Sequence, residues 1–279
     1  MAQRYLGTVR QIWRYPVKSM LGERLQAVGV SARGLYGDRA WALRESASGH
    51  LISAKKWPRM LELRASYEIA PADAEDRGVV RIDFPGGSIH AEDPVAPRLL
   101  SEFLGVALSV ERPGAKRAQI GIDPATVFGD IPASEILPGL APGTVLPPTF
   151  GAAHGTFFDT AAIHLIASAT LAHLGALQGS DAADPRRFRP NLLIETGAAA
   201  AGFVEDEWIG HTVAIGELRF DKLTPSLRCV MTTLAQADLP RDLSVLRTAA
   251  RHHRAMVGVT GRVTGHDAVR IGDPVFLFD

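Results

Sequence analysis

The sequence predicts an α+β protein that is rich in β-strands, with a β-barrel-like domain in its first half and a mixed β-barrel with attached helices in its second. From Gly7 to about Glu111, short runs of β-forming residues alternate with turn residues. In the second half strands again outnumber helices, and neighbouring strands could pair through short connections. A segment dense in proline and glycine separates the halves. We therefore expect domains over residues 1–120 and 156–279, joined by a connector over 121–155.

Turn chemistry predicts a hairpin in the first half. Ser-Ala-Ser-Gly separates AWALRE, residues 40–45, from HLISA, residues 50–54, and serine and glycine accept turn geometries that β-branched residues refuse. The same half contains one plausible helix, over residues 94–105, with a proline near its start and Gly105 at its end.

The second half is predicted to begin with the longest helix, over residues 159–175. Asp159 or Thr160 could cap its exposed amides, and Gly175 would end it. Strands are then expected in RRFRPNLLIE, TVAIGELRFDKL and RCVMTT, followed by a helix over residues 243–253 and a terminal β pair.

Composition limits the classes of partner. Thirty basic and thirty acidic residues cancel, so no strong field draws the chain to nucleic acid or to an anionic membrane surface. No stretch approaches the roughly 20 apolar residues that span a bilayer. The single cysteine cannot form an intramolecular disulfide, and the first residues contain no signal-peptide core. These features predict a cytoplasmic protein without nucleic-acid or membrane partners.

Three segments offer cations for an anionic ligand. If RRFRPN is extended, Arg187, Arg189 and Asn191 share one face and could cradle an anion. Lys18 and Ser19 stand at the tip of the first strand, in YPVKS, and GLYGDRAW places two glycines before an Asp-Arg pair that contains Arg39. Each segment has an ordinary alternative, namely a solvated strand edge, a solvated lysine or a tight turn with a surface ion pair.

Cys229 is either an inert buried thiol or a reactive one. Hydroxyls and a guanidinium surround it in TPSLRCVMTT, and they would favour a thiolate if they converged in space. Strict strand geometry would send Arg228 to the face opposite the sulfur, so both could touch one ligand only on an irregular backbone. The histidines make a poor zinc site, and the chain has no dinucleotide or P-loop motif, whereas no local signature marks a Cys-His hydrolase.

Taken in order, YPVKS, GLYGDRAW, RFRPNLLIE, LRCVMTT and IGDPVFLF resemble the MOSC family. The resemblance is to members with an N-terminal β-barrel domain ahead of the MOSC domain, such as the mitochondrial amidoxime-reducing component and its bacterial relatives. It runs from about Gly7 to Phe278. The fold expected from this resemblance is the one predicted above.

The resemblance implies a molybdenum cofactor, a pyranopterin whose dithiolene holds the metal and whose phosphate needs cations. The family's metal-ligating and catalytic cysteine falls on Cys229, and a soft thiolate suits such a metal. The residues that would bind the cofactor fall on Lys18, Ser19, Arg39, Thr160, Arg189, Asn191 and Arg228.

This chain departs from the family in three places. Leu227 stands where the mitochondrial members have a serine, with Ser226 beside it. Thr160 is followed by an alanine where the family often has a serine, and LAQADLP replaces the usual continuation after the cysteine. These changes affect substrate and electron-donor details rather than metal ligation.

The function implied is reduction of N-hydroxylated or N-oxide substrates. Electrons would come from a separate protein of the ferredoxin, flavodoxin or cytochrome type, because the chain has no motif for flavin, NAD or an iron–sulfur cluster. Two alternatives stay open. The chain could carry the cofactor without turnover, or it could transfer sulfur through a persulfide on Cys229.

Overall fold

The structure is a computed structural model that describes residues 3–114, 127–137, 157–181 and 183–279. Most of the expected connector therefore lies outside the described residues. Within the described ranges, no helix is both long and apolar enough to cross a membrane.

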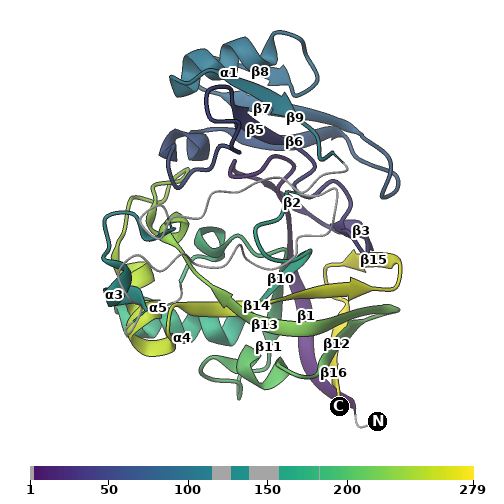
Figure 1. Ribbon diagram of the computed structural model, residues 1–279. Coiled ribbons are helices and arrows are strands. Elements are labelled where there is room, and N and C mark those ends of the chain that lie inside the picture. The colour runs from purple at the N-terminus through teal and green to yellow at the C-terminus, as the bar shows by residue number, and fades with distance from the viewer. Residues whose placement is uncertain (1–2, 115–126, 138–156, 182) are drawn as a thin grey trace.

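A closed barrel of seven strands forms the lower body of the molecule in Figure 1. All neighbouring strands are antiparallel except β10 and β11, so the barrel is mixed, as expected. Its interior is filled by one apolar cluster that includes Ile12, Trp208 and Phe220. Around the barrel the order is β11 (Leu192–Thr196), β10 (Ile163–Ala167), β14 (Met256–Thr264), β13 (Leu218–Leu227), β12 (Thr212–Ile215), β16 (Pro274–Phe278) and β1 (Gln3–Arg14).

The first strand of the sequence closes this barrel. β1 pairs with β11 on one side and with β16 on the other, which brings the two described ends of the chain together (Figure 1). Gly7 lies where the register of β1 shifts against β16, with φ 152°, and a Cβ there would meet the Glu195 carbonyl oxygen. Only glycine fits so close an approach. The division of the chain at residues 120 and 155 stays a prediction, and β1 pairs across it.

Smaller sheets lie above the barrel and surround a second apolar cluster, with α1 on top (Figure 1). Residues 40–45 and 50–54 are hydrogen-bonded to each other as the hairpin chemistry predicted. The elements of this layer are β5 (Ala42–Glu45), η1 (Pro58–Glu62), β6 (Arg64–Ile69), β7 (Val79–Phe84), β8 (Gly87–His90), α1 (Ala96–Leu104) and β9 (Leu108–Glu111). β2 (Glu23–Leu25) extends the barrel sheet beside β1, and a separate sheet of β15 (Asp267–Arg270), β3 (Ala27–Ser31) and β4 (Gly34–Leu35) packs on the barrel cluster. Helix α1 ends at Gly105 in the left-handed conformation, which confirms the predicted stop.

The remaining helices and turns pack beside the barrel. They are α3 (Ala133–Ile136), α4 (Ser168–Gln178), η2 (Pro185–Phe188), η3 (Val204–Trp208), η4 (Val230–Thr233) and α5 (Ser244–His253). Helix α5 confirms the helix predicted over residues 243–253.

The long helix predicted over residues 159–175 is wrong in its first half. Residues Ile163–Ala167 form β10, and α4 begins only at Ser168 and ends before Gly179. All five residues of β10 are buried between β11 and β14. A continuous apolar run does not distinguish a buried strand from a buried helix, which is why the pattern misled.

The predicted caps of that helix are also replaced. Neither Asp159 nor Thr160 reaches α4. Instead the carboxylate of Glu205, which is 2% exposed, accepts hydrogen bonds from the Ala167 amide at 2.6 Å and from the Thr170 hydroxyl. A buried carboxylate from η3 therefore satisfies the start of α4.

Glu205 should make the stability of the fold depend on pH. Burial raises its pKa to about 7, against the hydrogen bonds from Thr170 and Ala167, whereas its unfolded value is 4.5. The folded state therefore holds the proton more tightly, and this contribution is complete below about pH 4.5 and is lost as the pH rises through about 7. Its full size is about 3 kcal/mol of unfolding free energy.

We expect the Glu205→Gln variant to lose this slope when unfolding free energies are measured by urea titration between pH 5 and 8. Glu207→Gln is the matched control, because Glu207 lies in the same turn but is exposed and pairs with Arg4 at the surface. An equal slope in Glu205→Gln and the wild type would contradict this prediction.

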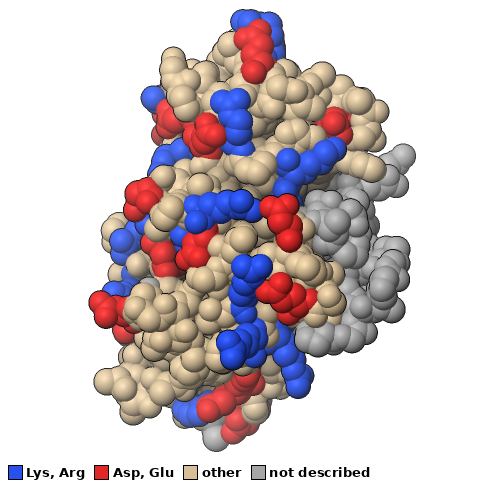
Figure 2. Space-filling view, turned by 90° about the vertical axis from the view of Figure 1, so that its left-hand side faces the viewer, with Lys and Arg blue, Asp and Glu red and all other residues tan. Residues whose placement is uncertain are grey.

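Charges are dispersed on one face of the molecule. On the face shown in Figure 2, Lys and Arg side chains alternate with Asp and Glu side chains and form no large patch of one sign. A local excess of charge is found instead in the pocket described next.

Candidate functional site

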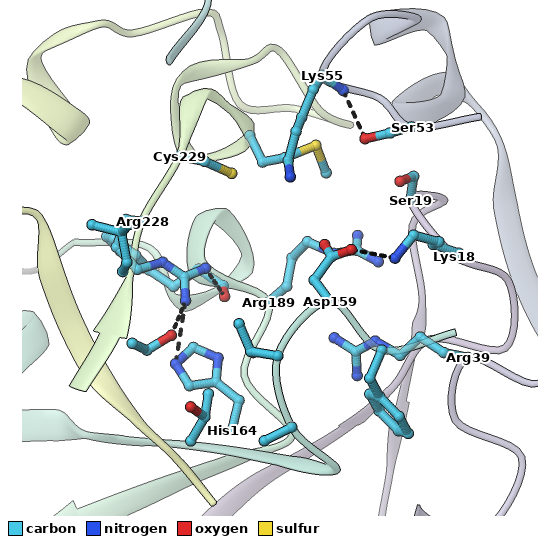
Figure 3. A pocket seen from close by; sticks show the side chains of 18 of the residues that line it. Lys18, Ser19, Arg39, Ser53, Lys55, Asp159, His164, Arg189, Arg228 and Cys229 are labelled. Atoms are coloured by element: carbon cyan, nitrogen blue, oxygen red, sulfur yellow. Dashed lines mark hydrogen bonds and ion pairs between the residues drawn. The ribbon is translucent and has the colours of Figure 1, made fainter. Parts of the chain in front are cut away.

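One pocket between the barrel and the upper layer brings together all eight predicted site residues (Figure 3). They come from the turn after β1, the segment between β4 and β5, the residues before β10, the turn from η2 into β11, and the end of β13. The residues are Lys18, Ser19, Arg39, Thr160, Arg189, Asn191, Arg228 and Cys229.

Cys229 lies at a break in regular structure. β13 ends at Leu227 and η4 begins at Val230, so Arg228 and Cys229 stand on irregular backbone and both line the pocket. This is the arrangement that a continuous strand would have prevented. The Cys229 side chain is partly exposed.

The hydroxyls near Cys229 do not converge on its sulfur. The Thr232 hydroxyl donates a hydrogen bond to the Cys229 carbonyl oxygen at 3.0 Å, and the Thr233 hydroxyl donates one to the Val230 carbonyl oxygen at 2.8 Å. They fix the turn that presents the thiol. The amide of Arg228, which donates to the Ala255 carbonyl oxygen at 2.7 Å, ties the same segment to the residues after α5.

Three of the pocket residues have left-handed backbone, which non-glycine residues seldom adopt. The φ angles are 67° for Ser19, 47° for Arg39 and 53° for Arg189. Each such conformation costs on the order of 1 kcal/mol and persists only where the surroundings impose it. The fold thus holds these side chains in place at an energetic cost.

A buried carboxylate organises one wall of the pocket. The side chain of Asp38 has no exposed surface. Its carboxylate accepts hydrogen bonds from the Tyr15 backbone amide at 2.7 Å and from the Asn191 side-chain amide at 2.8 Å, and it forms an ion pair with Arg39. The side-chain oxygen of Asn191 also accepts a hydrogen bond from the His164 backbone amide at 3.1 Å. In this structure Asn191 therefore braces the wall with both ends of its side chain.

The pocket has a cationic lining. Five of its residues are Lys or Arg, and one, Asp159, is acidic. Burial lowers the pKa of Lys18, which nevertheless donates to Asp159 and to the Phe157 carbonyl oxygen at 2.8 Å. Burial acts to raise the pKa of Asp159, but Lys18 and Lys55 outweigh it, so the pKa lies well below its usual value. Asp159 thus stays ionised and offsets part of the positive charge.

The guanidinium of Arg228 retains an unused donor. Nη2 donates to the Phe188 carbonyl oxygen at 2.6 Å and Nη1 to the Ser226 hydroxyl at 2.7 Å. Its Nε–H is buried and has no partner among the described residues. A buried, unpartnered donor of this kind is uncommon and fits an acceptor supplied by a ligand.

Sequence reasoning missed three titratable residues of the pocket, which are Asp159, Lys55 and His164. Lys55, in SAKKWP, points into the cavity in Figure 3. His164 lies on β10, where burial and then the Arg228 guanidinium lower its pKa well below the usual value, so the ring is neutral and its Nε2 lies 3.4 Å from Arg228 Nη1. A lysine after a predicted strand and a histidine in an apolar run carry no local signal of function.

Arg187 does not join the cradle. RRFRPN is not extended as predicted, because Asp184 accepts the Arg186 amide at 2.8 Å and starts the turn η2. Arg187 is turned away and donates to the Pro240 carbonyl oxygen at 2.8 Å and to the Thr232 carbonyl oxygen at 3.3 Å. It braces the segment that follows Cys229.

The donor set suits a large anion with a soft metal. The lining supplies an excess of cations, an unpartnered Arg228 donor and one thiol. The described residues contain no group of three or more His, Cys, Asp or Glu side chains able to hold a metal ion by themselves. A metal here would take Cys229 as a single soft protein ligand and its other ligands from elsewhere.

Two family models match the chain. One, described as "MOSC N-terminal beta barrel domain", matches residues 6–102, and the other, described as "MOSC domain", matches residues 152–276. Together they cover most of the sequence and contain all eight predicted site residues.

Curated relatives match at low identity. Mitochondrial amidoxime reducing component 2 of Bos taurus is 22% identical over 97% of this chain and 83% of its own length. Molybdenum cofactor sulfurase of Neosartorya fischeri is 24% identical over 80% of this chain, which spans only 32% of that protein. Among solved structures, the YUAD protein from Bacillus subtilis superposes with a TM-score of 0.47 and 9% sequence identity, covering 99% of this chain and 97% of that one.

Proposed function

This chain belongs to the MOSC family, and from that premise we propose that it binds a molybdenum cofactor and reduces N-hydroxylated or N-oxide compounds. The observation that carries the proposal is the pocket in which five cations surround a partly exposed thiol. The similarity to mitochondrial amidoxime reducing component 2 supports the choice of reaction.

Each residue has a proposed task. Cys229 would ligate molybdenum as a thiolate. Lys18, Arg39 and Arg189 would neutralise the anionic end of the cofactor, and Ser19 and Thr160 would donate hydrogen bonds to it. Arg228, whose Nε–H has no partner among the described residues, would add a further cation to the lining. When bound, the cofactor would supply the two-electron chemistry that, together with two protons, releases the oxygen of an N–O bond as water.

We further propose that electrons arrive from a separate redox protein of the ferredoxin, flavodoxin or cytochrome type, and that the reaction takes place in the cytoplasm. The sequence contains no motif for a bound flavin, nicotinamide or iron–sulfur cluster of its own. The chain would therefore provide only the site of substrate reduction.

The direct test is metal content together with turnover. The protein is purified from a host that makes the cofactor, molybdenum is measured by mass spectrometry, and benzamidoxime reduction is followed with a chemically reduced viologen as donor. We expect about one molybdenum per chain and formation of benzamidine. Molybdenum near zero would rule out the cofactor, whereas molybdenum without turnover would favour the carrier function.

Sulfur transfer is the second candidate, because one relative is named molybdenum cofactor sulfurase. In that case Cys229 would carry a persulfide. Intact-mass spectrometry would then show an adduct of one sulfur atom that a reductant removes, and Cys229→Ala would lack it. An unmodified mass would exclude this candidate for the purified protein.

Replacing Arg189 should weaken cofactor retention while leaving the fold intact. Arg189→Ala removes one buried cation from the pocket, and we expect molybdenum per chain after desalting to fall about tenfold. Arg186→Ala is the matched control, because Arg186 lies in the same turn but pairs with Asp184 and Asp238 away from the pocket. Equal occupancy in the two variants would refute the role of Arg189.

A further inference from the structure

Two arginines of the pocket stack on the same aromatic ring. The Cζ atom of Arg189 lies 4.1 Å from the centroid of the Tyr15 ring, and the Cζ atom of Arg39 lies 4.6 Å from it. Tyr15 follows β1, Arg39 lies between β4 and β5, and Arg189 follows η2. The ring itself is 3% exposed and contributes no hydrogen bond to the cavity.

The stacking offsets an electrostatic cost. Two guanidiniums gathered in a buried wall repel each other and lose hydration. Burial lowers the pKa of Arg189 to about 10, so the side chain keeps its charge at neutral pH. Burial also raises the pKa of Tyr15 to about 12, so the ring is neutral and its π face attracts both cations.

The ring is fixed at both ends. The Tyr15 amide donates to Asp38 at 2.7 Å, and the Tyr15 hydroxyl donates to the Pro190 carbonyl oxygen at 3.3 Å. The arginines are anchored separately, Arg39 by Asp38 and Arg189 by the Met20 carbonyl oxygen at 2.7 Å. Tyr15 is therefore a rigid platform between two anchored cations.

We propose that Tyr15 is a positioning residue, whose ring holds Arg39 and Arg189 as a preformed clamp for a phosphate group. The inference rests on the proposed function only in taking that phosphate to belong to the cofactor. Because Tyr15 holds the two guanidiniums together in the folded protein, the free-energy cost of bringing them close is met during folding rather than when the ligand binds. An uncharged, buried side chain can therefore affect binding.

Tyr67 offers the same chemistry outside the pocket. Its ring lies 4.3 Å from the Cζ atom of Arg14, and its hydroxyl donates to the Gly37 carbonyl oxygen at 3.1 Å. Truncating Tyr67 therefore removes a comparable stacking contact and hydrogen bond without touching Arg39 or Arg189. It is the matched control for Tyr15.

The test measures binding of inorganic phosphate to the full chain, made in a host without the cofactor, by isothermal titration calorimetry. Tyr15→Phe keeps the π face, and its affinity should stay within about twofold of the wild type. Tyr15→Leu should bind about tenfold more weakly, and Tyr67→Leu should bind like the wild type. In an Arg189→Gln background, Tyr15→Leu should cost less than it does in the wild type, because one of the two stacked guanidiniums is already gone.

Equal phosphate affinity in Tyr15→Leu and the wild type would overturn the inference, as would a wild type that binds no phosphate. If Tyr15→Leu does not fold, Tyr15→Met replaces it, since the flexible methionine side chain fills irregular space and lacks a π face. The proposed function fails separately. A wild type that binds phosphate through Tyr15 but purifies without molybdenum would refute the cofactor and leave the clamp standing.

Discussion

Replacement of Cys229 by alanine is expected to reduce the molybdenum content of the purified protein to background and to abolish benzamidoxime turnover. Cys229 is the single cysteine of the chain and lines the pocket beside Arg228. Loss of an outer-sphere partner already costs about 10- to 100-fold in metal affinity, so loss of the ligand itself should exceed a hundredfold. The measurement is molybdenum per chain, with circular dichroism to confirm the fold.

Met231→Leu is the control for this experiment. Met231 also lines the pocket and provides a second soft sulfur, but as a neutral thioether. We expect Met231→Leu to retain molybdenum. Full occupancy in Cys229→Ala would mean that the thiolate is not the ligand, and loss of molybdenum in Met231→Leu would mean that the effect of Cys229→Ala is not specific to the thiolate.

Removal of the Asp38 carboxylate should be the most destabilising single change in the pocket wall. Asp38→Ala leaves the Tyr15 amide, the Asn191 amide group and the Arg39 guanidinium without their shared buried acceptor. Removing one partner of a buried ion pair typically costs about 3–5 kcal/mol. We expect a loss of that size in the unfolding free energy measured by urea titration.

Asp83→Ala provides the comparison, because Asp83 pairs with Arg81 on the surface at 2.7 Å. An exposed pair of this kind contributes less than about 1 kcal/mol. Similar losses of unfolding free energy in the two variants would contradict the role of Asp38 as a shared buried acceptor. Asp38→Asn separates charge from geometry, since it can still accept the Tyr15 amide but no longer neutralises Arg39.

Local sequence signals predicted the short elements well. Gly105 ended α1, Ser and Gly formed the turn after β5, and α5 followed its amphipathic pattern. Where every residue is buried, apolar periodicity does not distinguish a strand from a helix. The five buried residues of β10 were therefore predicted as the first half of a helix. The turn η2 was not predicted because its cap, Asp184, lies before RRFRPN, the segment that was interpreted as a strand.

The candidate site was predicted from motifs, and its supporting residues were not. Lys18, Arg39 and Arg189 carry charges that suggest an anion, so each could be singled out in sequence. Tyr15 and Asp38 act by touching those arginines, and such contacts exist only after residues far apart in the chain have met. Lys55 was missed for the same reason, because only the fold points it into the pocket.

The position of β1 in the barrel sets the order in which the molecule can be completed during synthesis. β1 pairs with the nearby β2 through Ile12–Arg14, but the rest of its edges are paired by β11 and β16, which are synthesised much later. Until β16 emerges, residues Gln3–Thr8 of β1 lack their partner on one edge, and pairings of such long range form slowly. Because Lys18 and Ser19 follow β1 and the other pocket residues extend to Cys229 and Thr260, the pocket is complete only after β13 and β14 have been synthesised. A cofactor of the kind proposed could then be loaded only after these strands have been synthesised, and a chain stalled before them would expose unpaired strand edges of the kind that chaperones bind.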